Sequence, residues 1–367
     1  MPATFASPKL SHGLSFEDLY SQGGLSRLDG HFLSSLQRED PGLHERLSAA
    51  RAAPQALAAL AEAELLLAVA PHLDRFVANL FDIEAEWDAL RAGHEHLAPL
   101  FRVKRKFVQR RAMLKIKADE AATLDGPALE AEVAALIGGT FDELRFAEHV
   151  LRWQEDEAAH AAALSAAERF AAWSAHTAEG RWHHRAGVLF KPPQRVDPMH
   201  LVPTVQEAKP EGYTVHRLHH IRRRQGFALT DKGTDLAGAL DQANYCIWCH
   251  EQGKDSCSKG LKEKPAADGT VEFKKSPFGV PLAGCPLEER ISEFHKLKTE
   301  AWAIGALAMI VVDNPTVCAT GHRICNDCMK ACIYQRQTPV DIPQAETRTL
   351  KDVLGLPWGF ELSLIHI

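Results

Sequence analysis

The chain has 367 residues, of which 46% are hydrophobic and 25% are charged. These proportions are typical of a folded globular protein, and the length suggests two or three domains. The 42 lysines and arginines nearly balance 48 aspartates and glutamates, so the net charge of −6 gives no sign of nucleic-acid binding. No apolar stretch is long enough to predict a membrane span, and residues 1–15 lack the apolar segment of a secretion signal.

Residues 15–184 have the hydrophobic periodicity of helices. Leu73, Phe76, Val77 and Leu80 stand at positions i, i+3, i+4 and i+7, which form one stripe on a helix. Alanine is abundant in this half and runs of β-branched residues are scarce. We therefore expect a bundle of roughly five to seven helices.

Local signals indicate where some of these helices begin. Thr140 and Glu143 have the spacing of a capping box, which predicts a helix that starts there. Pro54 and Pro127 stand where first-turn prolines are favoured. Five prolines between residues 190 and 212 then mark a linker.

The N-terminal half offers little recognisable chemistry. Glu157 and His160 have the Glu-x-x-His spacing of di-iron bundles, but such a site needs two of these motifs and further glutamates. A solvent-facing helix surface is therefore favoured for this pair. His183 and His184 are either ligands or, in the interpretation that we favour, residues that close a helix, and neither supports a catalytic site.

All eight cysteines lie between residues 246 and 332. Cys246 and Cys249 form one C-x2-C pair, and Cys325 and Cys328 form another. The remaining cysteines are single residues, namely Cys257, Cys285, Cys318 and Cys332. Paired thiolates in so short a region indicate metal binding, and eight thiolates are the complement of two four-iron clusters.

Three other interpretations compete with this one. Four-thiolate zinc sites also use C-x2-C pairs, and eight cysteines would supply two of them. Cys246, Cys249 and His250 spell the C-x-x-C-H attachment signature of haem, which would use only two thiols and require export. Disulfides are typical of small secreted domains, and this chain is neither small nor visibly secreted.

The residues around the thiols carry a resemblance to a known family. The segment Gly284, Cys285, Pro286, Leu287 is followed by Ile291, Glu293 and Phe294. Later come Asn314-Pro315, Gly321-His322-Arg323 and the pair Cys325 and Cys328, with Cys332 after them. Residues 241–336 thus resemble the N-terminal dicluster domain of the glutamate synthase small subunit and its relatives, an α-helical ferredoxin also found in dihydropyrimidine dehydrogenase.

The resemblance implies how the thiols are divided between two [4Fe-4S] clusters. The first cluster would be bound by Cys246, Cys249, Cys257 and Cys332. The second would be bound by Cys285, Cys325 and Cys328, and we assign Cys318 as its fourth ligand, although relatives often use a non-cysteine residue further along the chain. Two clusters in one small domain would make an electron relay.

The sequence departs from the family pattern at two places, between its second and third cysteines and between its third and fourth. Seven residues separate Cys249 from Cys257, more than in relatives. A polar stretch over residues 258–284 then leads into Gly284-Cys285-Pro286, which we call the GCP turn. This stretch is predicted to loop out as an exposed insertion. Pro286 is either a rigid turn residue that directs Cys285 inward or an ordinary loop proline. Residues 301–312 are apolar and predict a buried core helix.

Two basic stretches stand outside the cysteine motifs. Residues 102–117 carry eight basic residues and no acidic one, and we interpret them as solvated helix surface. Residues 216–224 include Arg217, Arg222, Arg223 and Arg224 and precede the cysteine region. Their positive charge would offset anionic clusters or dock an acidic redox partner.

The family's FAD and NADPH domains follow its cluster domain and begin with a glycine-rich turn. No G-x-G-x-x-G motif occurs here, and the chain stops within the letters LSLIHI. We expect FAD and NAD(P) to belong to a missing C-terminal part or to a partner flavoprotein subunit. No catalytic residue is visible, so the chain alone is not expected to be an enzyme but part of an NAD(P)H-dependent flavoprotein oxidoreductase.

Together these patterns predict an all-α fold, with an N-terminal helical bundle followed by an α-helical ferredoxin-like dicluster domain. The expected divisions are a helical domain at 1–190, a linker with a basic helix at 191–240, the dicluster domain at 241–336 and an extension at 337–367. The predicted function is relay of electrons between a flavin/NAD(P)H oxidoreductase unit and a second redox centre in the cytoplasm. The alternative is a zinc-stabilised helical interaction module.

Overall fold

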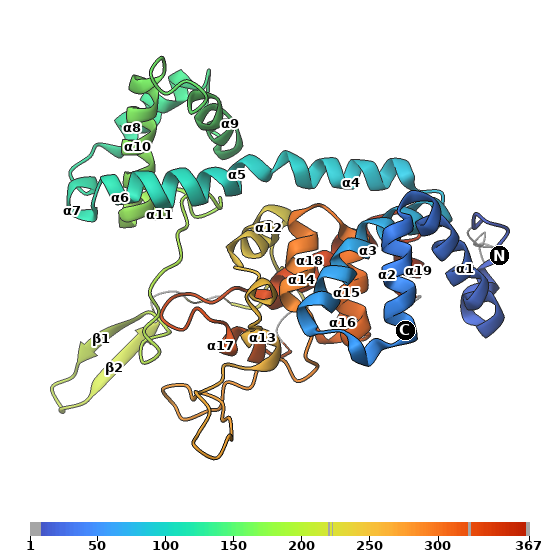
Figure 1. The fold of residues 1–367 in the computed structure, drawn as a ribbon. Coiled ribbons are helices and arrows are strands. Elements are labelled where there is room, and N and C mark those ends of the chain that lie inside the picture. The colour runs from blue at the N-terminus through green and yellow to red at the C-terminus, as the bar shows by residue number, and fades with distance from the viewer. Residues whose placement is uncertain (1–8, 219–220, 222, 322–323, 365–367) are drawn as a thin grey trace.

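The computed structural model describes residues 9–218, 221, 223–321 and 324–364. In this part of the chain the fold is mostly helical, as the sequence predicts, with one two-stranded antiparallel sheet (Figure 1). Arg222, His322 and Arg323, which the sequence analysis singled out, lie outside the described residues.

After a short 3-10 helix, η1 (Phe16–Tyr20), the chain forms three packed helices, α1 (Gln22–Glu39), α2 (Pro41–Ala52) and α3 (Ala59–Leu80). Between α2 and α3, Pro54 opens a short 3-10 helix, as predicted. The stripe expected around Leu73 does lie on a helix, α3. Its members divide between two cores: Phe76 packs against Phe32 and Leu36 of α1, whereas Leu80 faces the core of the C-terminal helices.

A long, nearly continuous rod of helix follows (Figure 1). It consists of α4 (Glu84–His96), α5 (Ala98–Val103), a π-helix η3 (Lys104–Ala112) and the short α6 (Met113–Lys115). The expectation of a solvated surface for residues 102–117 holds only in part. Lys104 is buried and its Nζ donates to both carboxylate oxygens of Asp241, at 2.6 and 2.8 Å.

A second helical layer packs on the far end of this rod around a core rich in phenylalanine. Its helices are α7 (Ala118–Ala121), α8 (Gly126–Leu136), α9 (Glu143–Trp153), α10 (Ala161–His176) and α11 (Ala178–His183). Pro127 lies in the first turn of α8, as predicted. The helices are more numerous and shorter than the sequence suggests.

The predicted capping box at Thr140 is wrong. Helix α9 begins at Glu143, but its N-cap is Asp142, whose carboxylate accepts the Arg145 N–H at 2.9 Å. The Glu143 carboxylate instead accepts the backbone N–H groups of Val188 and Leu189, at 2.8 and 3.0 Å. Asp142 lies closer to the first turn and outcompetes the threonine.

The predicted linker contains a β-hairpin. Strand β1 (Thr204–Ala208) pairs with β2 (Thr214–Leu218) in antiparallel register, with Thr204 opposite Leu218. The expected basic helix is therefore absent from the described part of residues 191–240, because His216 and Arg217 lie on β2. Arg217 pairs with Glu207 across the hairpin at 2.9 Å.

The described part of the C-terminal half contains nine helical elements. These are α12 (Leu236–Tyr245), η4 (Cys249–Gln252), α13 (Ser256–Lys259), α14 (Ile291–Thr299), α15 (Ala303–Asp313), α16 (Val317–Thr320), α17 (Asp327–Ala331), α18 (Ile342–Leu354) and α19 (Gly359–Leu364). The apolar α15 is the predicted core helix. A buried ion pair between Lys298 of α14 and Asp352 of α18, at 2.8 Å, fixes two of its neighbours.

Helices from the N-terminal part complete this C-terminal core. Ala70 and Leu80 of α3 and Trp87 of α4 pack with α14, α15 and α18 in one hydrophobic cluster. A buried carboxylate, Asp74 of α3, accepts the Gly305 N–H of α15 at 2.6 Å and also bonds the Trp87 indole. Packing thus crosses the expected boundary at residue 190, and the proposed domain divisions stay a prediction.

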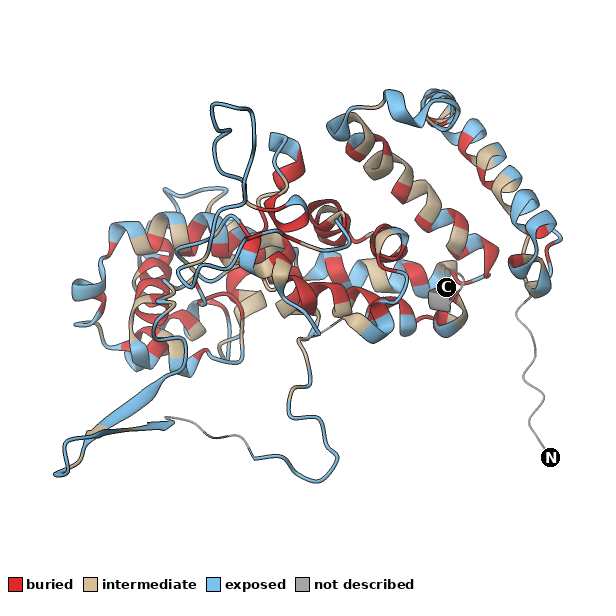
Figure 2. Cartoon of the chain, turned by 90° about the horizontal axis from the view of Figure 1, so that it is seen from below, coloured by how far each residue is buried: buried red, intermediate tan, exposed pale blue. Residues whose placement is uncertain are grey.

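The insertion between Cys257 and the GCP turn does loop out, as predicted. Most of residues 262–281 are exposed, and in Figure 1 they form the orange-gold loop at the lower edge. Figure 2 shows that the hairpin is also exposed along most of its length. Single bridges from Lys262 to Phe273 and from Lys275 to Pro281 hold the loop in shape. Within the described residues, no helix combines the length and hydrophobicity needed to cross a lipid bilayer.

Candidate metal centre

Four of the cysteines converge on one small buried pocket. Cys246 ends α12, Cys249 begins η4, Cys257 lies on α13 and Cys332 ends α17. All four are buried, and all four line the same pocket. This set, the first tetrad, is the one that the family resemblance assigned to the first cluster.

Local backbone geometry brings these thiols together. Trp248 has a left-handed conformation with φ of 51°, which folds the C-x2-C turn back so that its N–H reaches Cys246 Sγ at 3.4 Å. Burial raises the pKa of Cys332, and the nearby backbone N–H groups of Tyr334, Val340 and Ile333 partly offset that rise. Such donors are typical of sites that hold thiolate, because they stabilise negative charge on sulfur.

The first tetrad is electrostatically unfavourable for bare thiolates. Burial, aided by neighbouring thiols and Asp255, raises the pKa of Cys246 to about 12. Burial raises the pKa of Cys249 to about 11, again with Asp255 and Cys332 nearby. Burial also raises the pKa of Cys257 well above its ordinary value. Several thiolates there therefore need a cationic centre to compensate them.

An unpaired histidine also lines the first-tetrad pocket. His295 of α14 has no exposed surface, and neither of its ring nitrogens has a hydrogen-bond partner in the described structure. Burial, with some repulsion from Lys298, lowers its pKa to about 3, so the ring is neutral and carries one N–H. A buried donor without an acceptor is costly unless the site has an acceptor to offer.

Three further cysteines form a second group. Cys285 follows the GCP glycine, Cys325 lies just before α17, and Cys328 is buried on α17. Burial, the Cys285 and Cys325 thiols, and the Glu346 and Glu289 carboxylates all raise the pKa of Cys328. These are the cysteines that the resemblance assigned to the second cluster.

The GCP turn links the two groups. Cys285 N–H donates to the Cys257 carbonyl at 2.8 Å, and Glu288 N–H closes a β-turn onto the Cys285 carbonyl at 3.0 Å. Pro286 occupies the second position of this turn, which supports its interpretation as a rigid turn residue. Gly284 has φ of 84°, and a Cβ there would lie 2.5 Å from the Gly260 nitrogen.

Cys318 does not visibly join the second group. It lies exposed on α16, whereas Cys328 of the second group is buried. Helix α16 does pack against α18, which carries Glu346. The assignment of Cys318 as fourth ligand therefore stays a prediction.

Sequence reasoning missed a pair of buried carboxyl groups beside Cys328. Burial and the neighbouring Glu289 raise the pKa of Glu346 to about 8, and burial also raises the pKa of Glu289. Asn314 donates to Glu346 at 3.0 Å. Only Asn314 carried a signal in the sequence, as part of the Asn-Pro motif, because Glu289 and Glu346 lie too far apart along the chain to suggest a pair.

A different cluster lies in the N-terminal half. Glu130 Oε2 lies 2.9 Å from His183 Nε2, and a ring nitrogen of His184 lies within 4.8 Å of both ligand atoms. His183 ends α11, as predicted. Glu157 and His160 lie in the turn between α9 and α10, not on a helix, and Glu157 pairs with Arg111 at 2.5 Å.

These features define a mostly helical protein with a cysteine-rich centre. Two known proteins are similar to it in sequence. Residues 10–82 match a family model described as the RP005 N-terminal alpha-helical domain. The chain is 32% identical over 302 residues to the uncharacterized protein RP005 of Rickettsia prowazekii (strain Madrid E), across 80% of this chain and 99% of that protein. The chain therefore belongs to the RP005 family.

A second similarity covers a shorter segment but has a higher sequence identity. Over 49 residues the chain is 59% identical to the uncharacterized protein RP006 of the same organism, which is 13% of this chain but only 7% of that protein. The shared segment is thus a small part of a much longer relative. No solved structure matches the chain.

Proposed function

We propose that the chain is an electron-transfer protein that carries two [4Fe-4S] clusters and relays electrons between a flavin/NAD(P)H oxidoreductase unit and a second redox centre. The observation that carries the proposal is the first tetrad. Cys246, Cys249 and Cys257 come from one region of the chain and Cys332 from another, yet all four line one buried pocket. Each cluster would accept and release one electron at a time.

The spacing of the sulfur atoms favours clusters over single zinc ions. Four thiolates that bind one zinc ion at about 2.3 Å hold their sulfurs about 3.8 Å apart. In the described part of the chain, the one group with three or more ligand atoms within 4.8 Å is Glu130, His183 and His184. No three cysteine sulfurs of the described residues therefore lie mutually within 4.8 Å, which suits a cluster whose iron corners each bind one thiolate, and no cysteine is engaged in a disulfide.

Groups around the first tetrad also suit a cluster. The unpaired N–H of His295 would find an acceptor in a sulfur atom of the cluster, and the backbone donors at Cys332 would do the same. The buried Glu346, whose pKa burial and the neighbouring Glu289 raise to about 8, would stay largely protonated near neutral pH. Burial raises the pKa of Glu289 as well, so the pair would add less repulsion to the second cluster than two exposed carboxylates.

A basic hollow beside Cys249 is a candidate docking site for an acidic redox partner. The hollow has a volume of about 730 Å³, and it includes Cys249 and Tyr334. Its cations are Lys254, Lys259, Lys262, Lys274 and Arg336, opposed by the single carboxylate of Asp255. Complementary charge of this kind speeds the encounter of two proteins.

Flavin and NAD(P) would be supplied by a partner flavoprotein or a further domain. The 49-residue segment shared with the much longer RP006 supports a connection to a larger protein. Affinity purification of the tagged chain should recover a flavin-containing protein in the native host, and we expect the pair to work in the cytoplasm, where thiols stay reduced.

Metal analysis of the anaerobically purified chain tests the proposal. We expect a brown protein with about eight irons and eight acid-labile sulfides per chain. A Cys246→Ser variant should lose about half of both. A colourless protein with about two zinc ions and no sulfide would instead establish the zinc-stabilised interaction module.

The histidine cluster requires a control in this assay. Zinc bound by Glu130, His183 and His184 would be counted with any zinc on cysteine. A His183→Ala variant removes that source and leaves the cysteines intact, so zinc that persists in this variant belongs to the thiols.

A further inference from the structure

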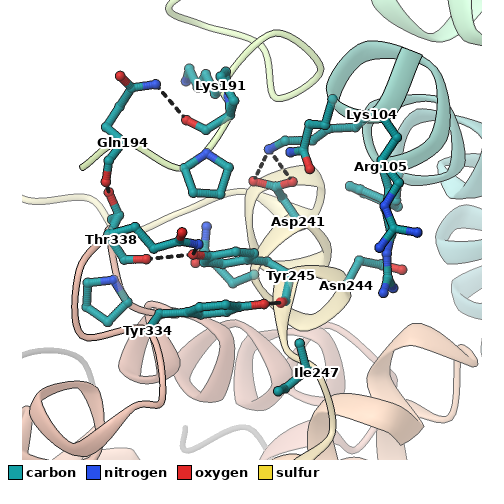
Figure 3. Close-up of a pocket in the computed structure, with 18 of the residues that line it drawn as sticks. Lys104, Arg105, Lys191, Gln194, Asp241, Asn244, Tyr245, Ile247, Tyr334 and Thr338 are labelled. Carbon is teal, nitrogen blue, oxygen red and sulfur yellow. Dashed lines mark hydrogen bonds and ion pairs between the residues drawn. The ribbon is translucent and has the colours of Figure 1, made fainter. Parts of the chain in front are cut away.

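A cavity of about 570 Å³ lies between the basic rod and the cysteine region. Its walls come from η3, from α12, from residues 191–194 and from residues 334–339 (Figure 3). Thr338 closes one side, because its N–H donates to the Gln194 carbonyl at 2.8 Å. The volume is within the range of sites that bind small organic molecules, roughly 300–1,000 Å³.

The charge of the cavity favours an anion. Lys104, Arg105, Arg110 and Lys191 line it, opposed by one carboxylate, Asp241. Because Asp241 is engaged by Lys104 at 2.6 and 2.8 Å, that pair is close to neutral. Four cations against one carboxylate leave an excess of three positive charges. Arginine side chains are well suited to bind phosphate through paired N–H donors.

The π-helix explains how two arginines serve one cavity. Arg105 and Arg110 are five residues apart and would lie about 140° apart around the axis of an α-helix. In η3 the hydrogen bonds run from residue i to i+5, which brings such residues onto nearly the same face. Both arginines line the cavity for this reason, whereas the exposed Arg102 and Lys106 on the same rod do not.

The opposite wall is aromatic and held firmly in place. Tyr245 and Tyr334 stack with ring centroids 4.4 Å apart and planes 3° from parallel. Figure 3 shows Tyr245 between Tyr334 and the Lys104–Asp241 pair. The Tyr245 hydroxyl donates to the Thr338 carbonyl at 2.8 Å and accepts from the Gln337 amide at 2.5 Å. A fixed aromatic surface opposite arginines suits a ligand that joins a planar ring to a phosphate.

The cavity also adjoins the first tetrad. Ile247 and Tyr334 line both this cavity and the cysteine pocket, so one layer of side chains separates the two. We propose that the cavity binds a phosphorylated ligand with a planar ring, of the mononucleotide class, with its phosphate on Arg105 and Arg110 and its ring beside Tyr245. The inference goes beyond the relay and needs no cluster for binding.

Titration of the full-length chain tests the site. Flavin mononucleotide, nicotinamide mononucleotide and AMP each join one planar ring to one phosphate, and equilibrium dialysis with each identifies the preferred ring. Inorganic phosphate represents the phosphate part of such a ligand, and riboflavin represents a planar ring without the phosphate. We expect at least one nucleotide to bind at least about tenfold more tightly than either half, since hydrogen bonds to charged groups are strong.

Paired variants localise the binding. Arg105→Ala with Arg110→Ala should weaken nucleotide binding about tenfold or more, whereas Arg102→Ala with Lys106→Ala removes the same charge from outside the cavity and should change it little. Equal loss in both double variants would show non-specific attraction and overturn the proposal, as would no nucleotide binding below millimolar concentration. Because binding is measured without regard to iron, its failure is distinct from failure of the cluster assignment.

Discussion

At the scale of single residues, the cysteine site depends on where each sulfur lies and on which polar groups face it. The resemblance divided the thiols into two sets, and the structure brings together all four of the first set and three of the second. What the sequence does not reveal is the surrounding shell. His295 and Glu346 are buried beside the thiols, but neither belongs to a spacing pattern that a sequence displays.

The fourth ligand of the second cluster is tested by two substitutions. We expect Cys318→Ser to reduce the iron content from about eight to about four, because iron clusters take four thiolates each. Glu346→Gln keeps the shape of the nearby carboxyl and should leave all the iron in place. Iron and sulfide assays on both variants decide the matter. If Cys318→Ser keeps its iron and Glu346→Gln loses half, the carboxylate is the ligand.

His295 offers a second test at this scale. A hydrogen bond to a cluster sulfur stabilises the reduced, more negative state, so its loss should make the reduction potential more negative. We expect His295→Phe to lower the potential of the first cluster by about 40 mV for a bond of about 1 kcal/mol. Redox titration followed by electron paramagnetic resonance measures both clusters. The second cluster serves as the internal control, and equal shifts in both would contradict a local role.

At the scale of elements, the GCP turn fixes the position of the second cysteine group relative to the first, because the Cys285 N–H donates to the Cys257 carbonyl. Its backbone passes so close to α13 that a Cβ on Gly284 would meet the Ser258 carbonyl oxygen at 2.7 Å. Glycine is therefore required at position 284 for two reasons, because a Cβ would clash there and because φ of 84° is unfavourable for other residues.

Gly284→Ala should destabilise the fold by about 2 kcal/mol or more, from the left-handed strain of about 1–2 kcal/mol and the added clash. Gly279→Ala is the matched control, because Gly279 has φ of 77° in the same loop but open space around its Cβ position. Urea unfolding compares the two. An equal loss in both variants would mean that backbone strain alone matters and that the close approach to α13 does not.

Across the whole molecule, much of the fold follows from local sequence, but the way its parts join does not. The helical stripe at Phe76, the core helix α15 and the exposed insertion were all predictable, because each rests on a local pattern. The β-hairpin was missed, since its strands are short and lie between prolines that suggested a loop. Helices α3, α4 and α15 share one core through contacts between residues that are more than 200 positions apart in the sequence. Local hydrophobic periodicity cannot predict such contacts.

Asp74 lies where these distant parts meet, and its titration should make stability depend on pH. Burial raises its pKa from 3.8 to about 6, despite hydrogen bonds from Gly305 and Trp87. The folded state thus binds a proton more tightly than the unfolded state. This contribution is fully present below about pH 3.8 and is lost as the pH rises through about 6.

Because the pKa rises from 3.8 to about 6, the proton on Asp74 contributes about 3 kcal/mol to the free energy of unfolding at low pH. About half of this contribution is lost between about pH 5 and 7.5. Other buried carboxyl groups titrate as well, so we compare the wild-type chain with Asp74→Asn by urea unfolding across this range. The wild-type chain should lose about 1–2 kcal/mol more than the variant as the pH rises. Parallel curves would mean that the proton on Asp74 does not couple α3 to α15.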